Sequence, residues 1–390
     1  MNPLYIQELL DRCIDFLDAS NPALRACSLV NRSWVHPAQA RIFSEIKLED
    51  PRTSLESLHI RVSGLLSLMD GSQHLIRYIS TLHMSNRAMP SPDHFVRICS
   101  FPFIRLSSLK IWHLDRLAPD SEVSVAIQRM LALPTLRSLH FACRFTDRKH
   151  FLGMWANCSS NITDLALSCR IEDDRAAPSG GPGPAAQRHI VLASFQANEI
   201  EDILWWLEDP HCPFNFTRLR ALLGAGTEIL QHGILAPVVK TVEVFDVTSK
   251  RSDLSAFTRL AVLQFRMPLW DPLSPLRALS TIRPAGRVHL RTLRLVLVIS
   301  GWLDPAQVLS SLCSQLDRTL FALIGQFSSL TTIYINVVVP TPAVTQRAEQ
   351  YFPSLDPQIS ISARTSGIRG MSCFKSSLIS VRALVSEQCV

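Results

Sequence analysis

The stretch from Tyr5 to Trp34 reads YIQELLDRCIDFLDASNPALRACSLVNRSW and sets the organisation of the chain. In its first half the apolar residues recur at steps of three and one, which places them on one face of a helix, opposite the charged residues. These apolar residues are Ile6, Leu9, Leu10, Cys13, Ile14 and Leu17. The spacing predicts an amphipathic helix.

A second and a third helix are predicted after the first. Asn21 can cap a new helix and Pro22 suits its first position, where a missing N–H costs little. The apolar face continues through Leu24, Cys27 and Val30. A third short helix is expected from the NRSW segment onward. Three helices within about 40 residues enclose little core, and units of this size usually gain stability from a partner.

This stretch resembles the F-box, a helical unit whose pattern opens on Leu-Pro-x-Glu-Leu-Leu and ends on Ser-Leu-Val-x-Arg-x-Trp. Glu8-Leu9-Leu10 and the segment SLVNRSW over 28–34 match that pattern. Tyr5-Ile6 departs from it, standing where the family has the Leu-Pro pair that touches the Skp-type adaptor of a cullin–RING ubiquitin ligase. The resemblance implies an F-box-like domain over residues 1–45 that binds such an adaptor. An ordinary N-terminal helical hairpin is the alternative.

The composition is that of a folded protein. Of the 390 residues, 47% are apolar, and the net charge of +6 is spread along the chain without a block of like charges. A chain of this length exceeds what one compact core usually organises, so two domains or an elongated repeat are expected. No basic run interleaved with aromatic residues supports binding to nucleic acid.

The sequence also bears on the compartment. Glu8, Asp11 and Asp15 stand where a signal peptide would be apolar, and no run of about 20 apolar residues predicts a membrane span. The ten cysteines are scattered without a C-x-x-C pair. We therefore expect a protein of the cytoplasm or nucleus, without a membrane partner, whose thiols act as small core residues.

A short phrase recurs along the rest of the chain: an apolar residue, two others, an apolar residue, one other and an apolar residue. Its central residues are Leu82, Leu109, Leu139, Leu165, Leu222, Val242, Leu263, Leu293 and Ile333, with a degenerate copy at Leu192. Spacings of about 20 to 30 residues are typical of leucine-rich repeats. The phrase predicts an α/β fold, an irregular leucine-rich-repeat solenoid of parallel strands and return helices over residues 46–359. A compact α/β domain with a parallel sheet is the alternative.

Helices and loops are predicted between these strands. Helical spacing of apolar residues predicts helices over 55–69, 123–133, 197–207 and 304–323, and a first strand over 46–48. The Gly- and Pro-rich segment 172–188 predicts a flexible insert, and residues 360–390 a tail or capping segment with a last strand or helix over 374–385. The whole arrangement resembles fungal F-box-like proteins with irregular repeats.

No enzyme or nucleotide motif is present: neither G-x-S-x-G, H-E-x-x-H, Walker nor G-x-G-x-x-G. Gly224-Ala225-Gly226 fits a turn, Glu172-Asp173-Asp174 fits a solvated loop better than a cation site, and His211-Cys212 has no second pair at zinc-ligand spacing. Trp205-Trp206 is expected to pack against a neighbouring repeat or to form an interaction patch. We expect no catalytic residue, cofactor or metal.

The resemblance implies a non-catalytic substrate-recognition adaptor of a cullin–RING ubiquitin ligase, with the helices on the Skp-type adaptor and the repeats on a target protein. The candidate adaptor-binding residues are Tyr5, Ile6, Leu9, Ile14, Leu17, Leu24, Val30 and Trp34, some of which must form the core of the helical unit itself. A binding scaffold outside a ligase is the alternative, motivated by Tyr5-Ile6. An enzyme on an α/β domain is a third hypothesis, which the missing motifs disfavour.

Overall fold

The chain folds as two compact units. Unit 1 holds residues 1–190 with the short pieces 201–203 and 210–214, and unit 2 holds the other residues to 390. The computed structural model describes residues 8, 11–14, 17, 22–30, 32–48, 54–118, 121–173, 189–197, 206–207, 212–225, 238–247, 253–268, 274–298, 326–339, 360–364 and 377–384. The predicted domain boundaries at 45/46 and 359/360 stay predictions.

Unit 1 begins with helices. Residues 11–14 are helical, α2 spans Pro22–Val30, and α3 spans Arg32–Ile42. The helix that was expected to begin at Pro22 is therefore present. α2 and α3 contact each other, and each buries a side chain completely, Leu24 on α2 and Ala38 on α3. The Nε atom of Arg41 donates a hydrogen bond to the carbonyl of Leu17 at 3.2 Å, which ties the end of α3 to the chain that precedes α2.

A parallel sheet follows in unit 1. Its strands, in spatial and chain order, are β1 (Glu45–Leu48), β2 (Thr81–Ser85), β3 (Ser108–Leu117), β4 (Ser138–Asp147) and β5 (Asp164–Asp173). The predicted centres are in register, because Leu82 pairs with Leu109, Leu109 with Leu139, and Leu139 with Leu165. All of these leucines are buried. The recurring apolar phrase therefore marks parallel strands here, as predicted.

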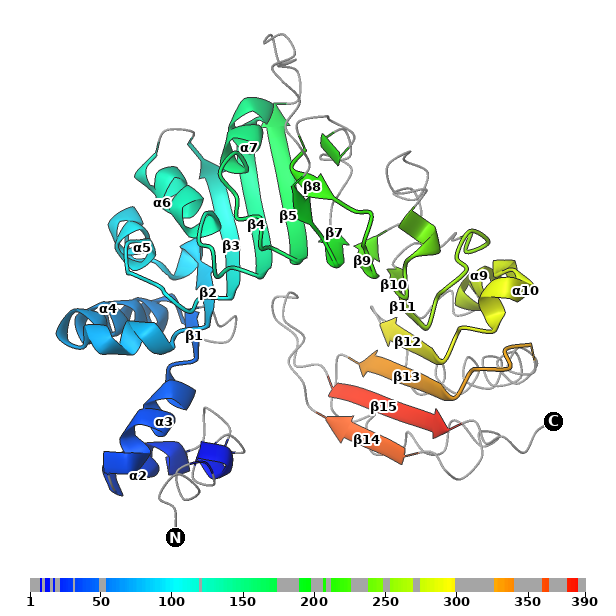
Figure 1. Ribbon diagram of the computed structural model, residues 1–390, viewed down its shortest axis with the longest axis horizontal. Helices are drawn as coiled ribbons and strands as arrows, with labels where there is room; N and C mark the ends of the chain where they lie inside the picture. Colours follow the sequence, from blue (N-terminus) through cyan, green and yellow to red (C-terminus); the bar gives the residue numbers. More distant parts are fainter. Residues whose placement is uncertain are drawn as a thin grey trace. The chain divides into compact units, whose positions relative to one another are not determined.

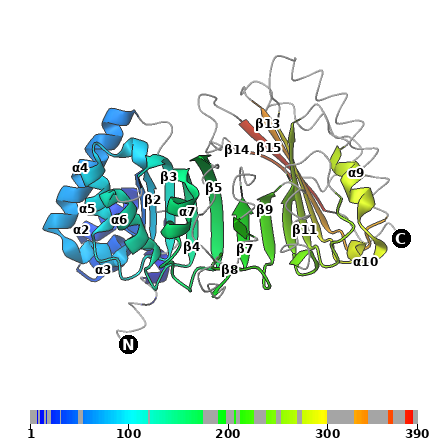
Figure 2. The same ribbon diagram turned by 90° about the horizontal axis from the view of Figure 1, so that it is seen from above.

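Helices cover one face of this sheet (Figures 1 and 2). They are α4 (Leu55–Gly71), α5 (Pro92–Cys99), α6 (Glu122–Leu131) and α7 (Arg148–Met154), with the 3-10 turns η1 (Gln73–Tyr78) and η2 (Asn86–Ala88) between strands. The helices predicted over 55–69 and 123–133 are confirmed as α4 and α6. Side chains cap three of them: Ser54 on α4, Ser121 on α6 and Asp147 on α7 each accept a backbone N–H of the first turn.

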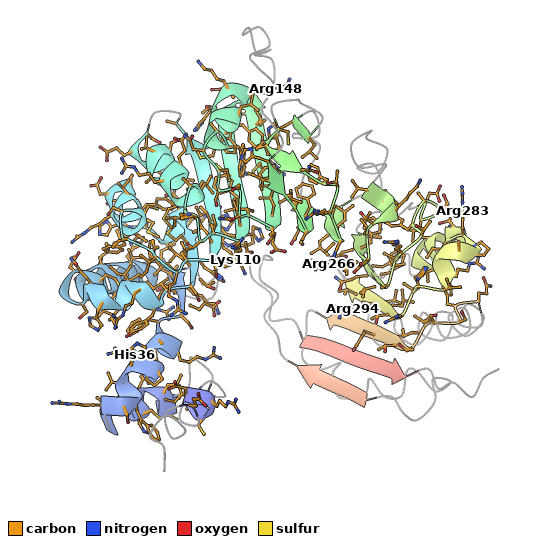
Figure 3. The ribbon with its side chains drawn as sticks, in the orientation of Figure 1. His36, Lys110, Arg148, Arg266, Arg283 and Arg294 are labelled. Carbon is orange, nitrogen blue, oxygen red and sulfur yellow. The ribbon has the colours of Figure 1, made fainter. Side chains whose placement is uncertain are left out.

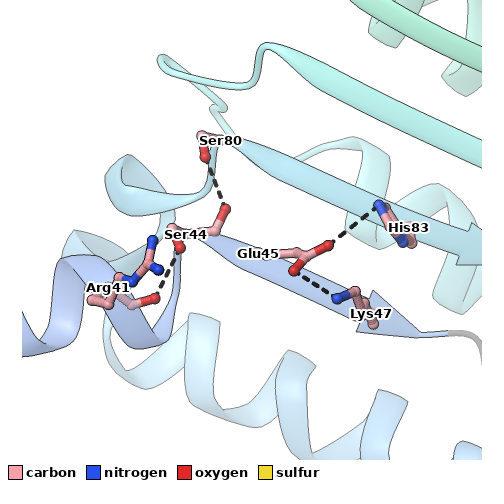
Figure 4. Close-up of polar contacts among 6 residues, drawn as sticks. All are labelled: Arg41, Ser44, Glu45, Lys47, Ser80 and His83. Atoms are coloured by element: carbon pink, nitrogen blue, oxygen red, sulfur yellow. Dashed lines mark hydrogen bonds and ion pairs between the residues drawn. The ribbon is translucent and has the colours of Figure 1, made fainter. Parts of the chain in front are cut away.

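A hydrogen-bond pattern repeats where each strand begins. The carbonyl of Ser44 accepts the backbone N–H groups of Ser80 and Thr81, both at 2.9 Å. The carbonyls of Ser80, Ser107 and Arg137 repeat this contact with the next strand. Figure 4 shows that the Ser80 hydroxyl also donates to the Ser44 carbonyl, at 3.0 Å. Successive segments therefore repeat in backbone geometry as well as in apolar pattern.

Unit 2 contains a second run of parallel strands. They are β7 (Ser194–Ala197), β9 (Ala221–Ala225), β10 (Val244–Val247), β11 (Val262–Pro268), β12 (Thr292–Val298) and β13 (Thr332–Val339). The turn η5 (Val238–Lys240) and the helices α9 (Ser274–Thr281) and α10 (Pro284–Arg287) lie between them in the chain, and the short strands β6 (Ile190–Val191) and β8 (Phe214–Asn215) pair with each other. The mixed α/β architecture with a large parallel sheet agrees with the prediction.

Two predicted strand centres are wrong by three residues. Phe195, not Leu192, pairs with Leu222, and Phe245, not Val242, pairs with Leu222 and Leu263. In β10 the apolar phrase fits in both registers. The strand is centred on Phe245, the later of the two positions, because Val238–Lys240 forms the turn η5 and the strand begins only after it.

The last two strands lie in the segment 360–390, which was predicted as a tail or capping segment. β15 (Ser377–Leu384) runs antiparallel to both β13 and β14 (Ser360–Arg364). Of the two alternatives predicted over 374–385, a last strand or a capping helix, the described residues form the strand β15. The flexible insert was predicted to begin at Glu172, but Glu172 and Asp173 are the last residues of β5. The rest of that insert, the helix predicted over 304–323 and most of the one over 197–207 lie outside the described residues. Within the part of the chain that is described, no helix has the length and apolar character of a membrane span.

Candidate functional site: the open face of unit 1

Alternate residues of β1 to β5 point away from the covering helices and form the open face of unit 1. Because the strands are in register, these residues form rows across the sheet. The first row is Glu45, Thr81, Ser108, Ser138 and Asp164. The next row, which we call the basic row, is Lys47, His83, Lys110, His140 and Ala166. The basic row thus carries two lysines and two histidines and no acid. Figure 3 shows Lys110 on the side of the sheet opposite the helices.

Glu45 organises one end of the basic row. Its Oε2 atom lies 2.6 Å from Nζ of Lys47, and its Oε1 atom lies 3.6 Å from Nε2 of His83 (Figure 4). The His83 side chain is almost fully buried, whereas Lys47 is exposed. One carboxylate therefore orients a lysine from its own strand and a histidine from the neighbouring strand on the same face.

His140 and Trp112 form an aromatic pair at the other end. Their ring centroids are 3.8 Å apart, with 43° between the ring planes. The Nε2 atom of His140 is buried and makes no hydrogen bond. Burial, assisted by the charges of Lys110 and His83, lowers the pKa of His140 to about 4. The imidazole is consequently neutral at pH 7.

A β-bulge in β3 lies beside this pair. Ile111 pairs with Phe141 and Leu114 with Cys143, so β3 has one residue more than β4 over this interval. His113, inside the bulge, has φ of 54°, a left-handed conformation that is uncommon for residues other than glycine. Bulges re-aim side chains, and strained backbone of this kind clusters at binding sites. The open face is therefore irregular at the point where its aromatic pair lies.

Unit 2 has a polar open face of its own. Nε2 of Gln264 donates to Oδ2 of Asp246 at 3.1 Å, and the Arg294 guanidinium lies 5.4 Å from the centre of the Tyr334 ring. Burial raises the pKa of Asp246, and the charge of Arg266 and the hydrogen bond from Gln264 oppose that shift. Figure 3 labels Arg266 and Arg294 on this unit. These two side-chain pairs connect neighbouring strands of unit 2, β10 with β11 and β12 with β13.

The predicted adaptor-binding residues fall into different environments. Ile14 and Leu24 are buried within the chain, so their side chains form core, whereas Leu17 and Trp34 are partly exposed. Val30 is the last residue of α2, and Tyr5, Ile6 and Leu9 lie outside the described residues. The role of this set in adaptor binding stays a prediction.

Sequence reasoning missed two features. Leu29 on α2 is 86% exposed, and it belongs to the F-box-like SLVNRSW segment, which was the available signal. The basic row occupies the position between the last two apolar residues of the repeated phrase, as His83 does between Leu82 and Met84. Reading that position from repeat to repeat would have shown Lys110 and His140 as well.

The residues considered for other chemistry lie in structural positions. Cys212 is fully buried, and His211, the preceding residue of the same candidate pair, lies outside the described residues. Trp206 is also fully buried, which favours packing over an interaction patch, and Gly224 has φ of 67°, as a turn or bulge requires. Burial raises the pKa of the Cys158 and Cys169 thiols to about 12. Among the described residues, no three His, Cys, Asp or Glu side chains gather as a metal site would need.

No protein-family model and no curated protein matches this chain. Among solved structures, the crystal structure of the Rad7 and Elc1 complex in yeast contains a chain that is 13% identical, with a TM-score of 0.33. The alignment covers 72% of this chain and 83% of that chain. Similarity at this level assigns neither fold nor function.

Proposed function

We propose that this protein is a non-catalytic substrate-recognition adaptor of a cullin–RING ubiquitin ligase. The helical segment of residues 1–45 binds a Skp-type adaptor, and the strands of the two units bind a target protein. The observation that carries the proposal is the open face of unit 1. There, polar and charged side chains stand in register on a sheet whose other face is covered by α4 to α7. Stacked repeats use such uncovered faces to bind partners.

The helical segment supports the adaptor part of the proposal through its sequence. Leu29 is 86% exposed on α2, whereas Leu24 on the same helix is 0% exposed. One exposed leucine is ordinary on a protein surface. We propose Leu29 as an adaptor contact because the sequence around it resembles the F-box. Binding of a Skp-type adaptor there would remove the Leu29 side chain from water.

In this function the protein brings the target close to the conjugating enzyme and does not itself catalyse a reaction. Holding a target beside a ubiquitin-loaded conjugating enzyme raises the effective concentration of the target's lysines. The absence of enzyme motifs from the sequence agrees with such a role.

The test is co-purification of the full chain with a Skp-type adaptor. The wild-type chain and Ala23→Asp, which adds the same charge to an exposed position of α2, are expected to retain the adaptor. Leu29→Asp is expected to lose it with an unchanged urea midpoint. A folded wild-type chain that retains no adaptor would favour the alternative, a binding scaffold outside a ligase.

A further inference from the structure

Helix α4, the first helix of the layer that covers the sheet of unit 1, has apolar side chains on two opposite faces (Figure 1). The inward face consists of four buried residues, Leu58, Val62, Leu66 and Met69. On the outward face Ile60 is 67% exposed and Leu68 is 40% exposed. A helix at the surface of a folded protein usually turns its apolar stripe to the core and charged residues to solvent. The outward apolar side chains of α4 instead remain in contact with water.

The outward face is a regular stripe without a charged residue. It runs through five exposed positions, Ser57, Ile60, Gly64, Leu68 and Gly71. Spacings of three, four, four and three residues place these positions on one face of the helix. A Cβ atom at Gly64 or Gly71 would meet nothing within 4 Å, so the space above both glycines is open. Because helices approach more closely where the side chains between them are small, this face suits another helix.

The stripe is symmetric about Gly64. Ile60 and Leu68 lie four residues before and after it, and Ser57 and Gly71 lie seven residues before and after it. An antiparallel copy of α4, related by a two-fold axis at Gly64, would set Ile60 of each chain against Leu68 of the other. A two-fold interface needs this self-complementarity, since both chains use the same residues. The pattern therefore fits a second copy of the chain.

The charged residues beside the stripe are compatible with this pairing. Under the same symmetry Glu56 would face Ser72, and Arg61 would face Ser67, so no like charges oppose each other. The contact is small, because a helix about 10 Å wide presents on the order of 200 Å² over about 21 Å of length. Stable complexes bury about 800 Å² per partner. The association is consequently expected to be reversible and to require a high protein concentration.

We propose that α4 is a self-association surface, through which two copies of this chain form a reversible antiparallel dimer centred on Gly64. The inference does not depend on the proposed ligase role. The dimer would bring two open faces into one assembly, which increases avidity for a target that offers two binding segments.

Sedimentation equilibrium of the full chain over a concentration series measures the association. The wild-type mass should rise from 43.6 kDa toward twice that value. Ile60→Glu and Leu68→Lys should each stay at the monomer mass, because each buries an unpaired charge in the apolar contact. Val125→Glu, which places a charge at an exposed apolar position of α6, should associate as the wild type does.

A mixture of two variants tests the antiparallel geometry. In a dimer of one Ile60→Glu chain and one Leu68→Lys chain, the two new charges face each other and the other contact between Ile60 and Leu68 stays intact. The mixture should therefore regain the dimer mass, which two misfolded chains would not do. A mixture of Ile60→Glu with Leu68→Glu should stay monomeric, because the new charges repel each other.

A wild-type chain that stays monomeric up to its solubility limit would overturn the inference, and so would a charge-paired mixture that stays monomeric. In a monomeric wild type, loss of the co-purified Skp-type adaptor on Ile60→Glu would assign this face to the adaptor. A lowered urea midpoint of that variant would assign the face to another segment of the same chain.

Discussion

The imidazole of His140 lies against the indole of Trp112, with 3.8 Å between the ring centroids, on the open face of a parallel sheet. This position removes the imidazole from water and sets it near the charges of Lys110 and His83. The lowered pKa of His140, about 4 against an ordinary 6.5, is the result.

The first prediction concerns the pH dependence of stability. Well above pH 6.5 His140 is neutral whether folded or unfolded and does not change stability with pH. As the pH falls below 6.5, the unfolded chain gains a proton that the folded chain does not take up. Stability is therefore lost progressively until about pH 4, by a total on the order of 3 kcal/mol.

Urea unfolding of the wild type and of His140→Gln between pH 7.5 and pH 5 checks this sign. The wild type should lose more stability than the variant as the pH falls. His74→Gln, which replaces an exposed histidine of η1, should behave as the wild type does. Parallel losses in the wild type and His140→Gln would contradict the prediction.

A second prediction concerns the backbone of the bulge. His113 has φ of 54°, which a β-branched residue adopts only with strain and glycine adopts freely. His113→Val should destabilise unit 1 by about 1 to 3 kcal/mol relative to His113→Gly in urea unfolding. Both substitutions remove the imidazole, so the difference between them isolates the backbone. Equal stability of the two variants would show that the bulge is unstrained.

Much of the fold is predictable from the sequence because each repeat must bury the same strand positions. Leu109 and Leu139 are spaced as repeats require, and both are buried and in register. The register of β10 was not predictable, since Val242 and Phe245 both complete an apolar phrase. Which one becomes the strand centre depends on pairing with Leu222 and Leu263, residues far away in the chain.

The candidate site was less accessible to sequence reasoning. The apolar phrase identifies the side chains that face the helices, but it does not specify which residues lie between them on the open face. Leu24 and Leu29 are equally apolar and lie on one helix, yet only Leu24 is buried. The bulge in β3 next to Trp112 adds one residue and has no signature in apolar spacing.

A third prediction concerns the contact between α6 and α7. The Ser124 hydroxyl and Nε2 of His150 lie 3.1 Å apart, and both side chains are buried. Ser124→Ala removes this hydrogen bond where water cannot replace it, and should cost about 1 to 3 kcal/mol in urea unfolding. Ser100→Ala, at an exposed position after α5, should cost less than about 0.5 kcal/mol. Similar costs for the two would mean that water reaches His150.

The last prediction compares the effect of a glycine-to-alanine substitution on stability at two positions. A Cβ atom at Gly286 in α10 would lie 2.5 Å from the carbonyl oxygen of Phe257 and 3.1 Å from Cγ2 of Ile282, so the helix could not keep its place. Gly286→Ala should destabilise unit 2 by about 1 to 3 kcal/mol. A Cβ atom at Gly64 in α4 meets nothing within 4 Å, and alanine is the better helix former, so Gly64→Ala should stabilise unit 1 by about 0.5 to 1 kcal/mol. Urea unfolding of both variants should give shifts of opposite sign for the same chemical change. A shift of the same sign in both would show that the close approach of α10 to Phe257 is not maintained in solution.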